Sequence, residues 1–113
     1  SLYSAAHPAV IQLIKEIVRT AKRSKTEVSL CGEMAGEPEF VMLLLGLGLS
    51  SLSVTPPAIL EVKKVIRSVT MSHCQRVARW VSTFDSDREV RNYLRNEARK
   101  MAPAVFENVT MDY

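Results

Sequence analysis

The chain has 113 residues, of which 47% are hydrophobic, and this length and composition suit one modest domain with an apolar core. Fifteen Lys and Arg against twelve Asp and Glu leave a net charge of +3, which is too small to predict nucleic-acid binding without a clustered basic face. The longest apolar run, residues 40–45, is far shorter than the roughly 20 residues that cross a bilayer, so no membrane segment is expected.

The start of the chain and the cysteine content bear on the compartment. There are two cysteines, and no signal-like apolar segment occurs at the start. A secreted disulfide scaffold is therefore not indicated, and we expect a cytoplasmic setting. We expect neither a nucleic acid nor a membrane as a partner.

The first half of the chain predicts a helix, a strand and a second helix. Apolar residues recur at helical spacing from Pro8 to about residue 21, and we expect this stripe to be buried: Val10, Leu13, Ile14, Ile17, Val18 and Ala21. The β-prone residues 27–31 predict a strand. Residues 38–48 predict a short helix that is apolar on nearly all sides, covered by neighbours and ended by Gly46 and Gly48.

The second half predicts one more strand and then helices only. Residues 51–55 predict the strand, which Pro56 and Pro57 close. Three amphipathic helices follow, with these apolar stripes: Ala58, Val62, Val65, Ile66 and Val69; Cys74, Val77, Ala78 and Val81; Val90, Tyr93, Leu94, Ala98 and Met101. Ser86 and Glu89 predict a capping box for the last helix.

The order strand, helix, strand predicts a right-handed parallel pair, the unit of doubly wound sheets and (β/α) barrels. A barrel needs eight strands and about 250 residues, so the chain supplies roughly a quarter of one. The predicted fold class is α/β: about two parallel strands with helices, followed by a helical C-terminal extension. We treat residues 1–113 as one partial domain.

A basic cluster lies on or just after the first predicted helix: Lys15, Arg19, Lys22, Arg23 and Lys25. Glu16 and Glu27 dilute it, and no aromatic residue is interleaved for base stacking. The preferred interpretation is a solvated helix face, and the alternative is a patch for a phosphate or an acidic partner.

Cys31 is the candidate reactive residue because it ends the first strand and enters a turn bracketed by Gly32 and Gly36. Side chains at the carboxyl ends of parallel strands line ligand sites. A thiol there can donate a proton, attack a substrate or bind a metal, and a packed small hydrophobe is the alternative. Glu33 could orient this turn, bind a cation or accept backbone N–H groups.

The other thiol and the histidines give no metal-ligand spacing with Cys31. We expect His73 and a buried Cys74 in an ordinary helix, and His7 as an extended residue before Pro8. The glycines also lack the spacing of a nucleotide-binding loop.

Several motifs resemble the C-terminal end of enzyme I, the phosphoenolpyruvate-protein phosphotransferase family of the bacterial phosphotransferase system. They are His-Pro-Ala-Val at 7–10, Leu-Ile-Lys at 13–15, Cys-Gly-Glu-Met-Ala-Gly at 31–36, Leu-Leu-Leu-Gly-Leu-Gly-Leu at 43–49 and Leu-Ser-Val at 52–54. The resemblance implies a C-terminal fragment of a (β/α)8 TIM-type barrel. Its last βα units would occupy residues 3–70, with strands at 27–31 and 51–55, and C-terminal helices would occupy residues 71–113.

The resemblance also implies a reaction. A phosphoryl group passes from phosphoenolpyruvate to a histidine of another domain, and the Cys31 thiol then protonates enolpyruvate to give pyruvate. Gly32 is the candidate substrate-binding residue. The parent enzyme would use Mg²⁺, with no ligand to it in this chain, would phosphorylate a phosphocarrier protein and would form a homodimer. We expect the fragment alone to be inactive.

Two departures from the family pattern and two alternatives stay open. Glu37 replaces the usual aspartate after the second glycine, and the prolines at 56 and 57 differ from the usual placement. One alternative is another phosphoenolpyruvate-utilising enzyme, such as pyruvate phosphate dikinase, although Met34-Ala35 and the Leu-Gly-Leu-Gly run favour enzyme I. The other is a non-catalytic interaction or dimerisation module.

Overall fold

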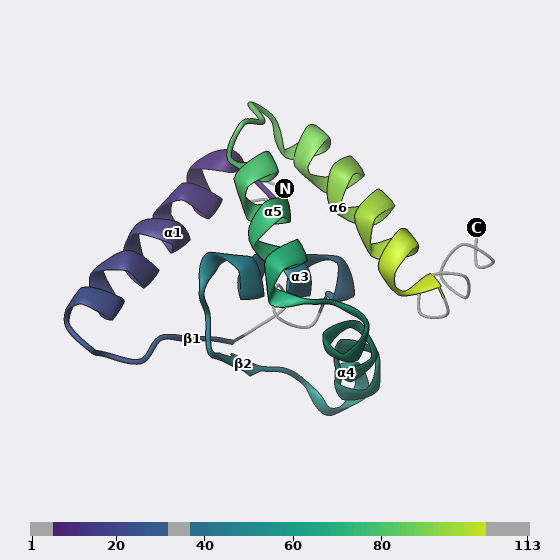
Figure 1. Cartoon of the computed structure of the whole chain (residues 1–113), viewed down its shortest axis with the longest axis horizontal. Helices are drawn as coiled ribbons and strands as arrows, with labels where there is room; N and C mark the ends of the chain where they lie inside the picture. The colour runs from purple at the N-terminus through teal and green to yellow at the C-terminus, as the bar shows by residue number, and fades with distance from the viewer. Residues whose placement is uncertain (1–5, 32–36, 104–113) are drawn as a thin grey trace.

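The computed structural model describes residues 6–31 and 37–103 of the chain. The fold is α/β and mostly helical (Figure 1). Its elements in chain order are α1 (Pro8–Arg23), β1 (Ser29–Cys31), α3 (Pro38–Leu47), β2 (Ser51–Ser53), the 3₁₀ turn η1 (Pro56–Ala58), α4 (Ile59–Ser68), α5 (Met71–Val81) and α6 (Asp87–Met101). None of the helices in these residues is long and apolar enough to cross a membrane.

The two strands form a parallel pair, as predicted, with α3 as the connection between them. Both strands are shorter than the predicted 27–31 and 51–55. On the amino side, the N–H of Leu49 donates to the carbonyl of Leu44, so Leu49 cannot extend the ladder towards Glu27. On the carboxyl side, the partners of Val54 and Thr55 in this register would be residues 32 and 33, which lie outside the described residues.

Helix α3 forms the centre of the molecule, between α1 and α6 (Figure 1). Five consecutive residues, Phe40, Val41, Met42, Leu43 and Leu44, are fully buried. Phe40, Leu43 and Leu44 pack with residues of α1, α5 and α6. Val41 and Met42 pack with residues of α4, α5 and α6. A helix with core on all sides must be apolar all round, which confirms the interpretation of residues 38–48.

The two glycines of this segment have different roles. Gly48 is the C-cap of α3, with φ of +102°, a left-handed conformation that favours glycine. Gly46 lies inside α3, so the prediction that it ends the helix was wrong. A Cβ at Gly46 would overlap the carbonyl oxygen of Cys74 and lie 3.1 Å from the Cβ of Ala78. Gly46 therefore lies at a close approach of α3 to the backbone of α5.

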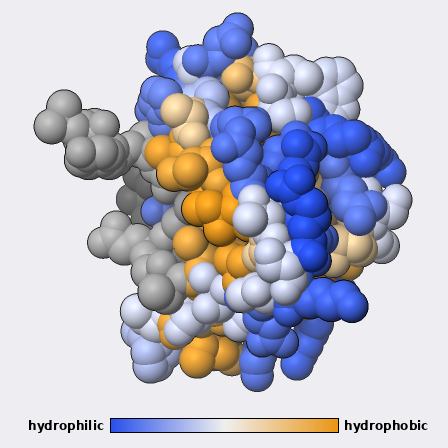
Figure 2. Space-filling model, turned by 90° about the vertical axis from the view of Figure 1, so that its left-hand side faces the viewer, coloured by the Kyte–Doolittle hydropathy of each residue, from blue (hydrophilic) through white to orange (hydrophobic). Residues whose placement is uncertain are grey.

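Helix α1 buries a narrower stripe than predicted. Ile11 and Val18 are buried, but Leu13 is 57% exposed and Ile17 49% exposed. The apolar residues span more of the helix circumference than the rest of the fold covers. Figure 2 shows the resulting apolar band on the side of the molecule where α1 lies.

The last three helices largely follow the predicted pattern. Val62 and Val65 of α4 are buried, whereas Ile66, predicted to be buried with them, is 43% exposed. The buried residues of α5 are Cys74, Val77 and Val81, and those of α6 are Val90, Leu94 and Ala98. The apolar stripes of α5 and α6 therefore face the core.

Side chains cap the amino ends of α5 and α6. Thr70 Oγ1 accepts a hydrogen bond from the N–H of His73 at 3.1 Å, and Ser86 Oγ accepts one from the N–H of Glu89 at 3.2 Å. The predicted pairing of Ser86 with Glu89 is thus present. Its second bond differs from that of a capping box, because the Ser86 hydroxyl donates to Glu89 Oε1 at 3.1 Å.

Candidate active site

The candidate site lies where the two parallel strands end. Cys31 is the last residue of β1 and pairs in register with Ser53, the last residue of β2. Leu30 and Leu52, one position earlier, pack against the core and hold this end of the sheet in place. The backbone of Cys31 is therefore placed at the carboxyl edge of the sheet, as the sequence predicted.

Two residues of the predicted site cannot be placed. Gly32, the candidate substrate-binding residue, and Glu33 both lie in residues 32–36, outside the described part of the chain. Their roles stay predictions. The chain is described again from Glu37, the residue before the first turn of α3.

Helix α6 anchors α3 where it leaves this turn. Arg91 lies 3.8 Å from the carboxylate of Glu37, and its guanidinium lies over the ring of Phe40, 5.5 Å from the centroid. Arg95, one turn further along α6, lies 4.0 Å from the carboxylate of Glu39. Helix α6 therefore positions the start of α3, directly after the segment that follows Cys31.

The sequence analysis missed this contact between α6 and α3. Arg91 and Arg95 are four residues apart and so lie on one helix face, and Glu37 and Glu39 flank Pro38. Two such pairs of opposite charge can be recognised in the sequence. The sequence does not show which acidic pair the arginines contact, because that depends on how the helices pack.

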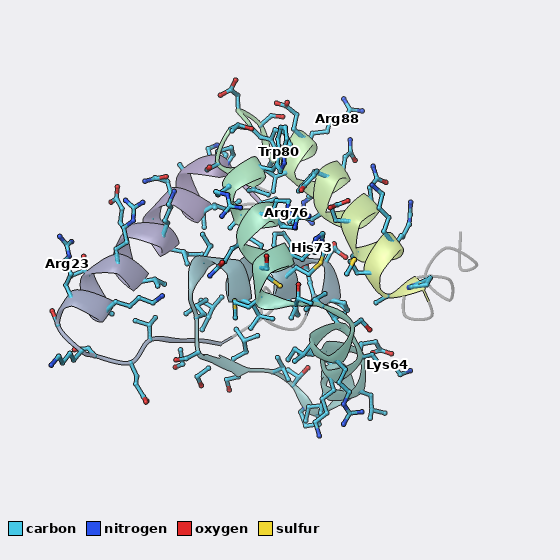
Figure 3. All side chains as sticks on the ribbon, viewed as in Figure 1. Arg23, Lys64, His73, Arg76, Trp80 and Arg88 are labelled. Atoms are coloured by element: carbon cyan, nitrogen blue, oxygen red, sulfur yellow. The ribbon has the colours of Figure 1, made fainter. Side chains whose placement is uncertain are left out.

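The two histidines and Cys74 lie on other elements than Cys31: His7 at the start of α1, and His73 and Cys74 in α5. His7 is the N-cap of α1, and its Nδ1 accepts a hydrogen bond from the N–H of Ala9 at 3.0 Å. His73 Nε2 lies 3.7 Å from Glu97 Oε1, on the side of α5 that faces α6 (Figure 3). Cys74 is fully buried, and this burial raises the pKa of its thiol. His7 is thus extended before Pro8, and His73 and the buried Cys74 lie in a helix, as expected.

No cluster of three or more His, Cys, Asp or Glu residues suitable for a metal ion occurs within residues 6–31 and 37–103. The resemblance implies Mg²⁺ ligands outside this chain, and this stays a prediction.

The parallel strand–helix–strand unit defines the class of the fold, which is α/β. Residues 1–71 match the family model of the PEP-utilising enzymes, PEP-binding domain. The chain belongs to this family.

Individual relatives agree with the family model. The chain is 42% identical over 76 residues to the phosphoenolpyruvate-protein phosphotransferase of Cupriavidus necator, covering 67% of this chain and 12% of that protein. It is 33% identical over 99 residues to the phosphoenolpyruvate-protein phosphotransferase of Mycoplasma genitalium, covering 88% and 17%. It is 36% identical over 89 residues to multiphosphoryl transfer protein 1 of Escherichia coli, covering 79% and 11%. The chain therefore spans less than a fifth of the length of these relatives.

Proposed function

We propose that this chain is the C-terminal part of a phosphoenolpyruvate-protein phosphotransferase and supplies the acid that completes the reaction. The observation that carries the proposal is the position of Cys31. It ends a parallel strand at the sheet edge where α/β proteins bind ligands, inside the segment that matches the PEP-binding domain. The names of the relatives support the substrate and the reaction class.

In the proposed reaction, the bond between phosphorus and the enol oxygen of phosphoenolpyruvate breaks and the phosphoryl group passes to a histidine nitrogen. The enolate of pyruvate remains. The Cys31 thiol donates its proton to the methylene carbon, which gives pyruvate and a thiolate, and the thiolate regains a proton from solvent. A general acid must carry its proton when the enolate forms, so the proposal requires a Cys31 thiol that is protonated at that moment.

The proposal includes the fold of the parent protein. We infer that the β1–α3–β2 unit belongs to a (β/α)8 barrel, with its last βα units in residues 3–70 and an extension in residues 71–113. The exposed side chains of Leu13 and Ile17 support this inference, because a further βα unit would cover them. Mg²⁺ would be held by residues outside this chain. The cytoplasmic parent would be a homodimer and would phosphorylate a phosphocarrier protein.

A substitution of the thiol tests the chemistry. In the complete enzyme, Cys31→Ala should lower pyruvate formation by roughly 100-fold or more, the usual contribution of a general acid. Phosphoenolpyruvate binding should stay within about threefold, because the thiol acts only on the enolate. Cys74→Ala is the matched control and should leave turnover unchanged. Equal turnover of the Cys31→Ala enzyme and the parent enzyme would refute the assignment.

Thiol labelling separates the proposed enzyme from a non-catalytic module. Phosphoenolpyruvate should slow alkylation of Cys31 in the complete enzyme. Cys74 should stay unlabelled throughout, because burial raises its pKa and blocks access to it. Alkylation of Cys31 at the same rate with and without substrate would instead favour the module. The 113-residue chain alone should show no micromolar binding of Mg²⁺-phosphoenolpyruvate by calorimetry.

A further inference from the structure

A basic groove of about 280 Å³ lies between α1 and α5, beside the last turn of α3. Its polar lining consists of Lys15, Arg19, Lys22, Gln75 and Arg79. Gly46 and Ala78 also line it, and their small size leaves the space open. We propose that this basic groove binds a small phosphate-type oxyanion.

The spacing of the polar lining residues places their side chains around one hollow. Lys15, Arg19 and Lys22 follow one another by four and three residues, so they lie on a single face of α1. Gln75 and Arg79 are four residues apart on α5 and likewise share a face. Two helices therefore present donor groups to the same hollow. Arg79 brings a cation from a part of the chain more than fifty residues away from α1, which the sequence cluster at 15–25 did not include.

The groove concentrates positive charge. Its four cations exceed the net charge of +3 of the whole chain, and none of its lining residues is acidic. Within the described residues, none of the four forms an ion pair. The single acidic residue of α1, Glu16, borders a different hollow with Leu13 and Ile17, and α5 has no acidic residue.

Two of the four cations have a structural reason for their positions. A Cβ on Gly48 would lie 2.6 Å from Lys22 Nζ, so this ammonium sits over the C-terminal end of α3, where the helix dipole favours a cation. Arg79 lies in the last turn of α5, where the dipole of that helix likewise favours a cation. Lys15 and Arg19 have no such partner in the described structure, and a bound anion would neutralise them together with Arg79.

The chemistry of the groove selects the class of ligand. Arginine guanidinium groups bind phosphate oxygens in pairs, and the Gln75 amide adds a neutral donor. The volume of about 280 Å³ has room for a small anion. Its lining has no aromatic residue on which a nucleic-acid base could stack.

The groove is separate from the candidate active site. Cys31 precedes the start of α3, whereas the groove lies beside Gly46, near the end of this helix. Ten residues at 1.5 Å per residue separate the two ends of α3 by about 15 Å. The inference therefore stands independently of the proposed function.

Titration of the protein with pyrophosphate and inorganic phosphate tests whether the basic groove binds an oxyanion. Calorimetry should show saturable binding with a Kd of about 1 mM or tighter, and the amide signals of Gly46 and Ala78 should shift in ¹⁵N spectra. Lys15→Gln/Arg19→Gln and, separately, Arg79→Gln should each weaken binding roughly tenfold, because charge-assisted hydrogen bonds are lost. Far-ultraviolet circular dichroism checks that each variant keeps its helix content.

The matched control is Lys63→Gln/Arg67→Gln, an exposed Lys and Arg pair of the same spacing on α4. This helix, on which Figure 3 labels Lys64, lies across the molecule from α1. The control and Cys31→Ala should both bind as the parent does. Three results would refute the proposed anion site: no saturable binding, an equal loss of affinity in the control, or unchanged binding by Arg79→Gln. Tighter binding of glycerol 3-phosphate than of inorganic phosphate would identify the ligand as a phosphate ester, and the reverse order would identify free phosphate.

Discussion

At the scale of single residues, Gly46 shows how tertiary contact changes the role of an amino acid. In isolation, a glycine near the end of an apolar helix indicates a helix terminus. In the folded chain it lies within α3, against the backbone of α5 at Cys74. The missing side chain is what allows two helices of the core to meet, and it also helps to leave the basic groove open.

Gly46→Ala should destabilise the protein by about 2 kcal/mol or more. The added methyl group must displace the backbone of α5, and this outweighs the gain of about 1 kcal/mol that alanine brings in a helix. The midpoint and slope of urea unfolding measure the change. Adding Ala78→Gly should not restore stability, because the main overlap is with the Cys74 carbonyl. A Gly46→Ala protein more stable than the parent would contradict this close approach.

At the scale of elements, local and distant interactions define α6. Ser86 caps its amino end, and Asp87 and Glu89 in its first turn and Arg99 and Lys100 in its last turn suit the helix dipole. Arg91 and Arg95 then tie the helix to the first turn of α3. The element that the sequence predicted only as a helical extension therefore supports the segment next to Cys31.

Removing the cap tests the contribution of α6. Ser86→Ala should lower the free energy of unfolding by about 1 kcal/mol, because the N–H of Glu89 loses its acceptor. Thermal or urea unfolding measures the difference. Ser72→Ala is the control, since Ser72 is exposed in the first turn of α5 and is not the residue that caps this helix. Equal effects of the two substitutions would show that the cap contributes nothing measurable.

At the scale of the whole molecule, the described fold leaves some large apolar side chains exposed. Leu13 and Ile17 line an open hollow together with Ala21 of α1 and Val28 just before β1. Exposed apolar bands of this kind mark surfaces that contact another part of a protein or a partner. The two-stranded sheet gives the same indication, since each strand has a single neighbour among the described residues.

Polar substitutions along α1 test this distribution of burial. In the 113-residue chain, Ile17→Gln should change the stability by less than about 0.5 kcal/mol, as is usual at exposed positions. Ile11→Gln, on the buried face of the same helix, should cost about 2 kcal/mol or more. Urea unfolding compares the two. In a complete barrel, Ile17→Gln should become destabilising, and an equal effect of both variants in the chain alone would contradict the exposed position of Ile17.

The amino-acid sequence by itself determined the features that depend on neighbouring residues. Helical spacing predicted α1, α4, α5 and α6, and an apolar run ended by glycines predicted α3. Short β-prone runs predicted both strands, and the helix between them predicted their parallel order. The cap of Ser86 and the end of β1 at Cys31 were also predictable, because caps and strand ends are set within a few residues. The chemical role of Cys31 came from the family resemblance and stays a proposal.

Tertiary structure alone decided the features that join distant segments. Packing selected which apolar residues of α1 are buried, made Gly46 a contact instead of a helix end, and paired Arg91 and Arg95 with the carboxylates around Pro38. It also brought Arg79 to the basic residues of α1. Helical periodicity marks the face that a helix can bury, but the partner on that face depends on contacts between residues far apart in the chain.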